Sequence, residues 1–224
     1  MWGFFNNKKM KEVYCISGLG ADKRAFQYLK LNNCNLHFIE WIEPLKNETI
    51  SNYTSRLLEQ VKRKNPILIG MSFGGMIAVE MAKQINIEKL ILISSIKSKC
   101  EMPLLYRLIS TTGIQHIFPL KKIKYAYKIA FWFFGVKQEK EKKFLKNILI
   151  DTNPDLFAWS IKAAISWQNK NQPNNCYHIH GSVDKIFPIK NIKANYVVKD
   201  GGHFMIVNKA SAISTELNKI LIEN

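Results

Sequence analysis

The chain has 224 residues, of which 47% are hydrophobic and 22% charged, a composition typical of a globular protein and not of a disordered one. Lys and Arg outnumber Asp and Glu by 33 to 17, which gives a formal net charge of +16. No apolar run is long enough for a membrane span, and the N-terminal sequence lacks the apolar core of a signal peptide. The four cysteines are widely spaced, so we expect neither a zinc site nor disulfides, and a reduced, cytoplasmic protein.

Short apolar segments alternate with helical patterns along the chain. In residues 1–96 the pattern predicts four strands, over 13–18, 36–41, 66–70 and 89–95. Between them it predicts a short helix over 23–30 capped by Asp22, a helix over 49–65 and a helix over 73–85. Residues 97–172 look helical throughout. The alternation then resumes with strands over 176–182 and 195–200 and a helix over 205–222.

This alternation of apolar strands and helices predicts an α/β fold: a mostly parallel sheet of about six strands with helices on both faces. The helical block is too long to be a loop, so we expect it to pack over one end of the sheet. The predicted organisation is a core formed by residues 1–96 and 173–224 and a helical cap formed by residues 97–172.

Much of the positive charge lies in the predicted cap. Residues 97–150 hold 12 Lys and Arg against 3 Glu, a net charge of +9. A solvated lysine-rich surface and a docking site for an acidic partner both explain such a run. No nucleic-acid-binding motif accompanies it, so we expect no nucleic-acid partner.

Ser72 lies between Gly70 and Gly74 in the sequence Gly-Met-Ser-Phe-Gly, where a predicted strand runs directly into a helix. Such a turn strains the backbone at its apex, and small residues two positions away on each side leave room for it. The turn would expose the serine hydroxyl above the carboxyl edge of the sheet, where α/β folds bind ligands. The pattern therefore predicts a nucleophile, whereas a simple helix cap would not require both glycines.

A serine hydroxyl needs a general base, and the base needs an orienting acid. Asp184 follows the fifth predicted strand, and His203 follows the sixth in the Gly-rich sequence Asp-Gly-Gly-His. We expect Ser72, His203 and Asp184 to form a catalytic triad. The sequence holds no nucleotide-binding fingerprint or metal-ligand spacing, so no cofactor or metal is expected.

The serine motif, the order Ser72–Asp184–His203 and the strand–helix alternation resemble the α/β-hydrolase superfamily over nearly the whole chain. The overall layout is similar to bacterial carboxylesterases and to pimeloyl-carrier-protein methyl ester esterases. The resemblance implies an oxyanion hole formed by the backbone N–H groups of Leu19 and Phe73. The chain departs from the family at Ser17, where many relatives have histidine. Only about twelve residues precede the first strand, so the family's N-terminal hairpin is expected to be missing or vestigial.

The resemblance implies acyl transfer to water from a small carboxylic ester, and an acidic acyl carrier protein would fit the basic cap. A thioesterase, a carbon–carbon bond hydrolase and a non-catalytic ligand receptor that keeps the triad remain alternatives. Trp167 and Phe204 are candidates for the substrate pocket. His178 and His180 lie two apart on one face of a predicted strand, and the sequence offers no further ligands for a metal beside them.

Overall fold

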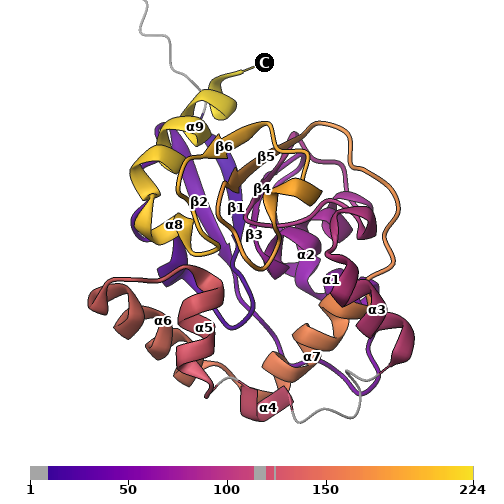
Figure 1. Ribbon diagram of the computed structural model, residues 1–224. Coiled ribbons are helices and arrows are strands. Elements are labelled where there is room, and N and C mark those ends of the chain that lie inside the picture. Colours follow the sequence, from indigo (N-terminus) through magenta and orange to yellow (C-terminus); the bar gives the residue numbers. More distant parts are fainter. Residues whose placement is uncertain (1–9, 114–119, 124, 224) are drawn as a thin grey trace, which may run out of the picture.

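The computed structural model describes residues 10–113, 120–123 and 125–223, and its centre is a single β-sheet (Figure 1). All strand pairs are parallel, and the strands lie in the order β2-β1-β3-β4-β5-β6. Their bounds are Lys11–Ile16 (β1), Cys34–Ile39 (β2), Ile67–Met71 (β3), Lys89–Ile93 (β4), Cys176–Gly181 (β5) and Tyr196–Val198 (β6). The predicted parallel sheet of six strands is thus confirmed.

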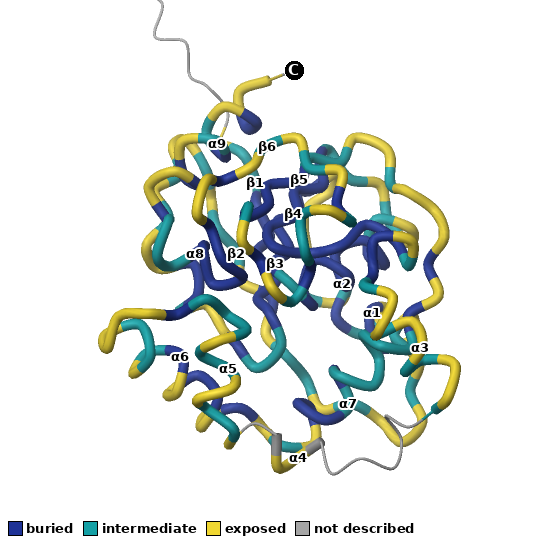
Figure 2. The backbone as a smooth tube through the Cα atoms, viewed as in Figure 1, coloured by how far each residue is buried: buried dark blue, intermediate teal, exposed yellow. Residues whose placement is uncertain are grey.

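Helices cover both faces of this sheet because alternate residues of each strand point to opposite sides. Val13 and Cys15 of β1 belong to one buried cluster, which the C-terminal helices α8 (Met205–Asn208) and α9 (Ala210–Ile222) complete. Tyr14 and Ile16 belong to the other cluster, which α1 (Ile50–Leu57) and α2 (Phe73–Ala82) complete. Figure 2 shows the resulting pattern, with the central strands β3 and β4 fully buried and most exposed residues on the outer helix faces, the loops and the edge strands.

The connection from β4 to β5 is helical. After a short 3-10 turn (Lys99–Glu101), its described helices are α3 (Leu104–Thr112), α4 (Leu120–Ile123), α5 (Tyr127–Phe134), α6 (Glu139–Asp151) and α7 (Pro154–Ser166). In Figure 1, α4, α5, α6 and α7 lie below the sheet, and α3 lies beside α7. None of the helices in the described ranges is long and apolar enough to cross a bilayer.

Two predicted helices are shorter in the structure. The helix that begins at the Thr49 cap ends at Leu57, and a 3-10 turn (Leu58–Gln60) follows it. Beyond this turn the backbone N–H groups of Lys62 and Arg63 donate to the hydroxyl of Tyr14 (3.0 and 3.2 Å), and these tertiary contacts replace further helical hydrogen bonds. Asp22 caps as predicted, but the element that follows it is a 3-10 turn (Lys23–Phe26).

Candidate active site

Ser72 occupies the sharp turn between β3 and α2. Its backbone has φ 52° and ψ −122°, a conformation that is strained for a residue with a Cβ. Hydrogen bonds hold this backbone on both sides: the Ser72 N–H donates to the carbonyl of Ile93 (3.0 Å), while the Ser72 carbonyl accepts from Gly75 N–H (2.9 Å) and from Ser95 Oγ (2.6 Å). The sheet and the helix thus fix the position of the serine.

The flanking glycines are needed because backbone segments approach closely at the turn. A Cβ on Gly74 would lie 2.1 Å from the carbonyl oxygen of Ser17, on the loop after β1. A Cβ on Gly70 would lie 2.5 Å from the Cα of Gly75. The two glycines therefore let the start of α2 pack directly against β1 and β3, which places Ser72 beside the loop that follows β1.

A chain of hydrogen bonds joins Ser72 to His203 and Asp184. The Oγ of Ser72 lies 2.8 Å from Nε2 of His203, and Nδ1 of His203 lies 2.9 Å from Oδ2 of Asp184. Asp184 and His203 are 4% and 1% exposed, so the hydrogen bond between them is shielded from water, while the bond to Ser72 is partly buried. The structure therefore brings together the three residues that the sequence placed on separate loops.

The charge state of Asp184 fixes the proton positions in this chain. Burial alone would raise the pKa of the carboxyl, but the charge and hydrogen bond of His203 outweigh it and lower the pKa. The other oxygen, Oδ1, accepts the backbone N–H groups of Ile186 (2.8 Å) and Phe187 (2.9 Å). An ionised carboxylate only accepts, so Nδ1 of His203 donates, and Nε2 is left as the acceptor for the Ser72 hydroxyl. The arrangement can therefore remove the proton of that hydroxyl.

The loop after β1 is held by Ser17, the residue that departs from the family pattern. Its hydroxyl donates to the carbonyl of Ala21 (2.6 Å), and the indole N–H of Trp41 reaches both Ser17 Oγ and that carbonyl (2.9 Å each). Within the described residues, the backbone N–H groups of Leu19 and Phe73 donate no hydrogen bond. Both amides are therefore available to an external acceptor.

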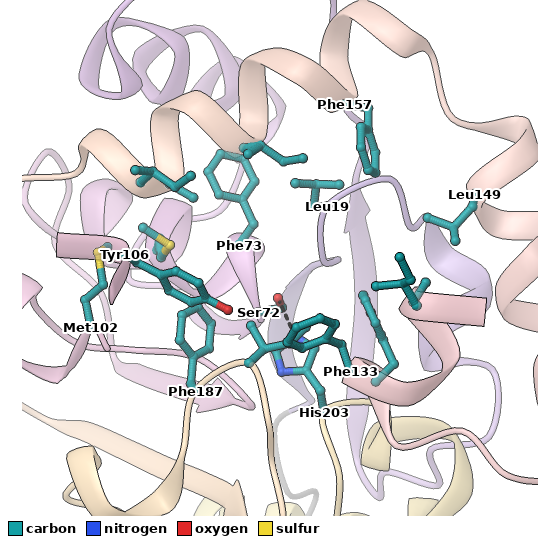
Figure 3. A pocket seen from close by; sticks show the side chains of 18 of the residues that line it. Leu19, Ser72, Phe73, Met102, Tyr106, Phe133, Leu149, Phe157, Phe187 and His203 are labelled. Carbon is teal, nitrogen blue, oxygen red and sulfur yellow. Dashed lines mark hydrogen bonds between the residues drawn. The ribbon is translucent and has the colours of Figure 1, made fainter. Parts of the chain in front are cut away.

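A cavity of about 340 Å³ opens above Ser72 (Figure 3). Its wall combines residues of the core with residues of α3, α5, α6 and α7, and Figure 3 shows rings of phenylalanine around the serine hydroxyl. Among the described residues that line it, the polar side chains are those of Ser72, His203 and Tyr106, and none is Lys, Arg, Asp or Glu. The cavity therefore suits an uncharged, apolar group.

The two pocket residues expected from the sequence do not line this cavity. Trp167 is 2% exposed, and its indole N–H donates to Glu80 Oε1 (2.7 Å) at the far side of α2. Phe204 is 1% exposed and packs against Phe134, which does line the cavity.

The lining residues that the sequence reasoning missed include Tyr106, Phe133, Leu149 and Phe157. They lie on helices of the β4–β5 connection, and no motif marks them. The aromatic residues scattered through residues 97–172 were the only signal in the sequence that pointed to an apolar cavity wall.

Comparison with solved structures identifies the fold. The chain is similar to a bromoperoxidase from Bacillus anthracis (18% identity, TM-score 0.70, covering 96% of this chain and 93% of that one). An esterase from Exiguobacterium antarcticum (17% identity, TM-score 0.70, 96% and 93%) and MenH from S. aureus (18% identity, TM-score 0.70, 96% and 95%) are equally similar. No protein-family model matches the chain, and no curated protein matches it significantly in sequence.

The six-stranded parallel sheet of this chain and its flanking helices match these structures over more than nine-tenths of each chain. The chain therefore has the α/β-hydrolase fold, as the resemblance in the sequence implied.

Proposed function

We propose that this chain is a serine hydrolase that cleaves a carboxylic ester with an uncharged, apolar acyl group. The observation that carries the proposal is the 2.8 Å hydrogen bond between Ser72 Oγ and His203 Nε2 at the base of an apolar cavity. A strained turn that presents a hydroxyl to a neutral imidazole is the arrangement that nucleophilic acyl transfer requires.

In this mechanism His203 takes the proton of Ser72 as the hydroxyl attacks the carbonyl carbon. The negative charge that develops on the carbonyl oxygen is stabilised by the backbone N–H groups of Leu19 and Phe73. His203 then protonates the leaving alcohol and activates a water for hydrolysis of the acyl-enzyme. Asp184 stays ionised and holds the imidazole in the required tautomer.

The cavity supports the choice of substrate. Its volume of about 340 Å³ falls within the range of about 300–1,000 Å³ that is typical of small-molecule sites, so it has room for an acyl chain. A carboxylate or phosphate buried there would find no lysine or arginine among the described lining residues. In this proposal residues 97–172 act as the cap that closes over the acyl group.

A thioesterase or a carbon–carbon bond hydrolase would use the same serine, base and acid, and the leaving group distinguishes them. A receptor that binds a ligand without cleaving it would need the cavity but not an activated serine. The lining suits a neutral acyl group in an ester and in a thioester alike; we favour the ester because the protein of the Exiguobacterium comparison is named an esterase.

The test is covalent labelling by a fluorophosphonate, read by intact mass. We expect one adduct on the wild type and none on Ser72→Ala. The matched control, Ser211→Ala, changes an exposed serine of α9 and should label like the wild type. A folded wild-type protein that takes up no probe would contradict the proposal and favour the ligand receptor.

Turnover then decides the bond type. We expect hydrolysis of uncharged esters of medium acyl chain length, with rates abolished in Ser72→Ala. Faster turnover of thioesters than of oxygen esters with the same acyl group would move the assignment to a thioesterase.

A further inference from the structure

A second buried histidine lies beside Asp184, near the carboxylate oxygen that also contacts His203. His180 is the next-to-last residue of β5 and is 0% exposed. Its Nε2 lies 2.7 Å from the carbonyl oxygen of Phe187 and 3.5 Å from Oδ2 of Asp184. The mechanism above does not use this residue.

The hydrogen-bond partners of His180 fix its tautomer. A carbonyl oxygen only accepts, so Nε2 of His180 carries a proton and donates it to the carbonyl of Phe187. Nδ1 is then the acceptor, and it lies 3.2 Å from Nε2 of His178 on the same strand. Burial, with the neighbouring His180 second, lowers the pKa of His178 well below its usual value, and burial also lowers the pKa of His180 although Asp184 opposes this.

The groups that surround His180 determine its charge and its partners. Among the described residues no group of three His, Cys, Asp or Glu side chains could hold a metal ion. The titratable groups that face His180 are Asp184, His178 and His203, and Lys97 lies near His178. A neutral His180 therefore donates to the turn that carries the acid without adding a cation there.

That turn links three parts of the site. Asp184 Oδ1 accepts the amides of Ile186 and Phe187, so the turn folds around the carboxylate. The ring of Phe187 lines the cavity and lies 5.7 Å from the ring of His203, in an edge-on orientation. A contact that holds the Phe187 carbonyl therefore constrains both Asp184 and the part of the cavity wall that lies beside His203.

We propose that His180 is a positioning residue: by donating to the Phe187 carbonyl it fixes the Asp184–Phe187 turn, and so orients the carboxylate toward His203. The inference rests on the proposed function, because it concerns the efficiency of the same triad. If His180 is replaced by a residue with no donor, the buried Phe187 carbonyl loses this hydrogen bond, and we expect the Asp184–Phe187 turn to shift.

The test compares three substitutions of His180. Gln can place an N–H near the position of Nε2, whereas Asn is too short to reach the Phe187 carbonyl and Leu has no donor. For His180→Leu and His180→Asn we expect kcat per fluorophosphonate-titrated site to fall on the order of 10- to 100-fold, with KM nearly unchanged. His180→Gln should recover most of the loss.

His178 supplies the comparison: it is equally buried on the same strand and contacts His180 through Nε2, but within the described residues no hydrogen bond joins it to Asp184 or Phe187. His178→Leu should keep kcat within about threefold of the wild type. The proposal would be overturned by a His180→Leu enzyme with wild-type kcat per titrated site, or by equal losses for His178→Leu and His180→Leu.

A readout without substrate separates this inference from the proposed function. The downfield proton resonance of His203 Nδ1–H reports its hydrogen bond to Asp184, and it should shift upfield or disappear in His180→Leu but persist in His180→Gln. An unchanged resonance in His180→Leu would reject the positioning role even if the protein cleaved no ester at all.

Discussion

Ser72 shows how a single residue depends on its surroundings. A backbone at φ 52° and ψ −122° costs on the order of 1–3 kcal/mol, so the neighbouring structure must hold it in place. Hydrogen bonds from β4 and α2 do so, and Gly74 allows the close approach that they require. The strained conformation places the hydroxyl at the apex of the turn, where it contacts His203.

Gly74→Ala should therefore destabilise the protein strongly. The new Cβ would meet the carbonyl oxygens of Ser17 and Ile16 at 2.1 and 2.4 Å, and backbone atoms cannot rotate away. We expect the free energy of unfolding to fall by about 3 kcal/mol or more in urea titrations. Gly113→Ala, at the left-handed end of α3, is the comparison and should cost only about 1–2 kcal/mol. Similar losses for the two variants would contradict the clash.

The buried histidines of β5 predict a pH dependence of stability. Their folded-state pKa values lie below the unfolded value of about 6.5. Below that pH the unfolded chain binds protons that the folded chain does not, so stability is full above pH 6.5 and falls as the pH drops. The limiting slope is about 1.4 kcal/mol per pH unit for each histidine.

His178→Leu should reduce this slope between pH 6.5 and 5, since it removes the histidine whose pKa is lowered most. Urea titrations at a series of pH values measure it. A variant with the wild-type slope would show that His178 takes up its proton in the folded state.

The triad was predictable from the sequence because each member follows a recognisable strand. Parallel strands bring their carboxyl ends to one edge, so Ser72, Asp184 and His203 had to converge there. Trp167 and Phe204 could not be placed in the same way, because the direction of a side chain depends on helix packing that no motif encodes. The roles of the triad residues and of the Leu19 and Phe73 amides remain predictions that the labelling and kinetic experiments test.

At the scale of elements, the strands were predicted more accurately than the ends of the helices. Each strand is a short apolar run bounded by loop residues, whereas helix ends depended on tertiary contacts such as those of the Tyr14 hydroxyl. The C-terminal helix was expected to be continuous over 205–222. The structure interrupts it at Lys209, which has φ −125° and ψ 25°, and no Gly or Pro marks this break.

Helix α7 forms one wall of the cavity, so its side chains should set the length of the acyl group. Phe157→Ala removes a ring that lines the cavity, and we expect the preferred ester to become longer by several carbons. The variant should also lose about 3–5 kcal/mol of stability, as buried phenylalanines do. Hydrolysis of an ester series measures the shift.

Phe144→Ala is the control, because Phe144 of α6 packs against Phe204 and does not line the cavity. It should leave the preferred chain length unchanged. An identical shift in both variants would mean that loosened packing, and not the shape of the wall, alters the preference.

The charge of the whole molecule bears on its partner. The net charge of +16 would attract an acidic carrier protein and would leave a neutral ester unaffected. We expect hydrolysis of a methyl ester carried on an acyl carrier protein to slow as salt rises from 0.05 to about 0.5 M, because a shorter screening length weakens steering. A small neutral ester is the control. A carrier-bound substrate whose rate does not depend on salt would favour the solvated lysine surface.

The order of the strands affects how insertions and deletions can alter this chain during evolution. β4 and β5 are neighbours in the sheet although the connection between them, from Ile93 to Cys176, contains helices α3 to α7. The entropy of closing a loop grows only with the logarithm of its length, about 0.6 kcal/mol per doubling. Insertions in the exposed loops of this connection therefore cost the sheet little entropy, provided that the buried residues of α6 and α7 stay packed against the core, and they can rebuild the wall around the serine. Insertions and deletions between Ile93 and Cys176 offer a route by which substrate preference can drift without loss of the fold.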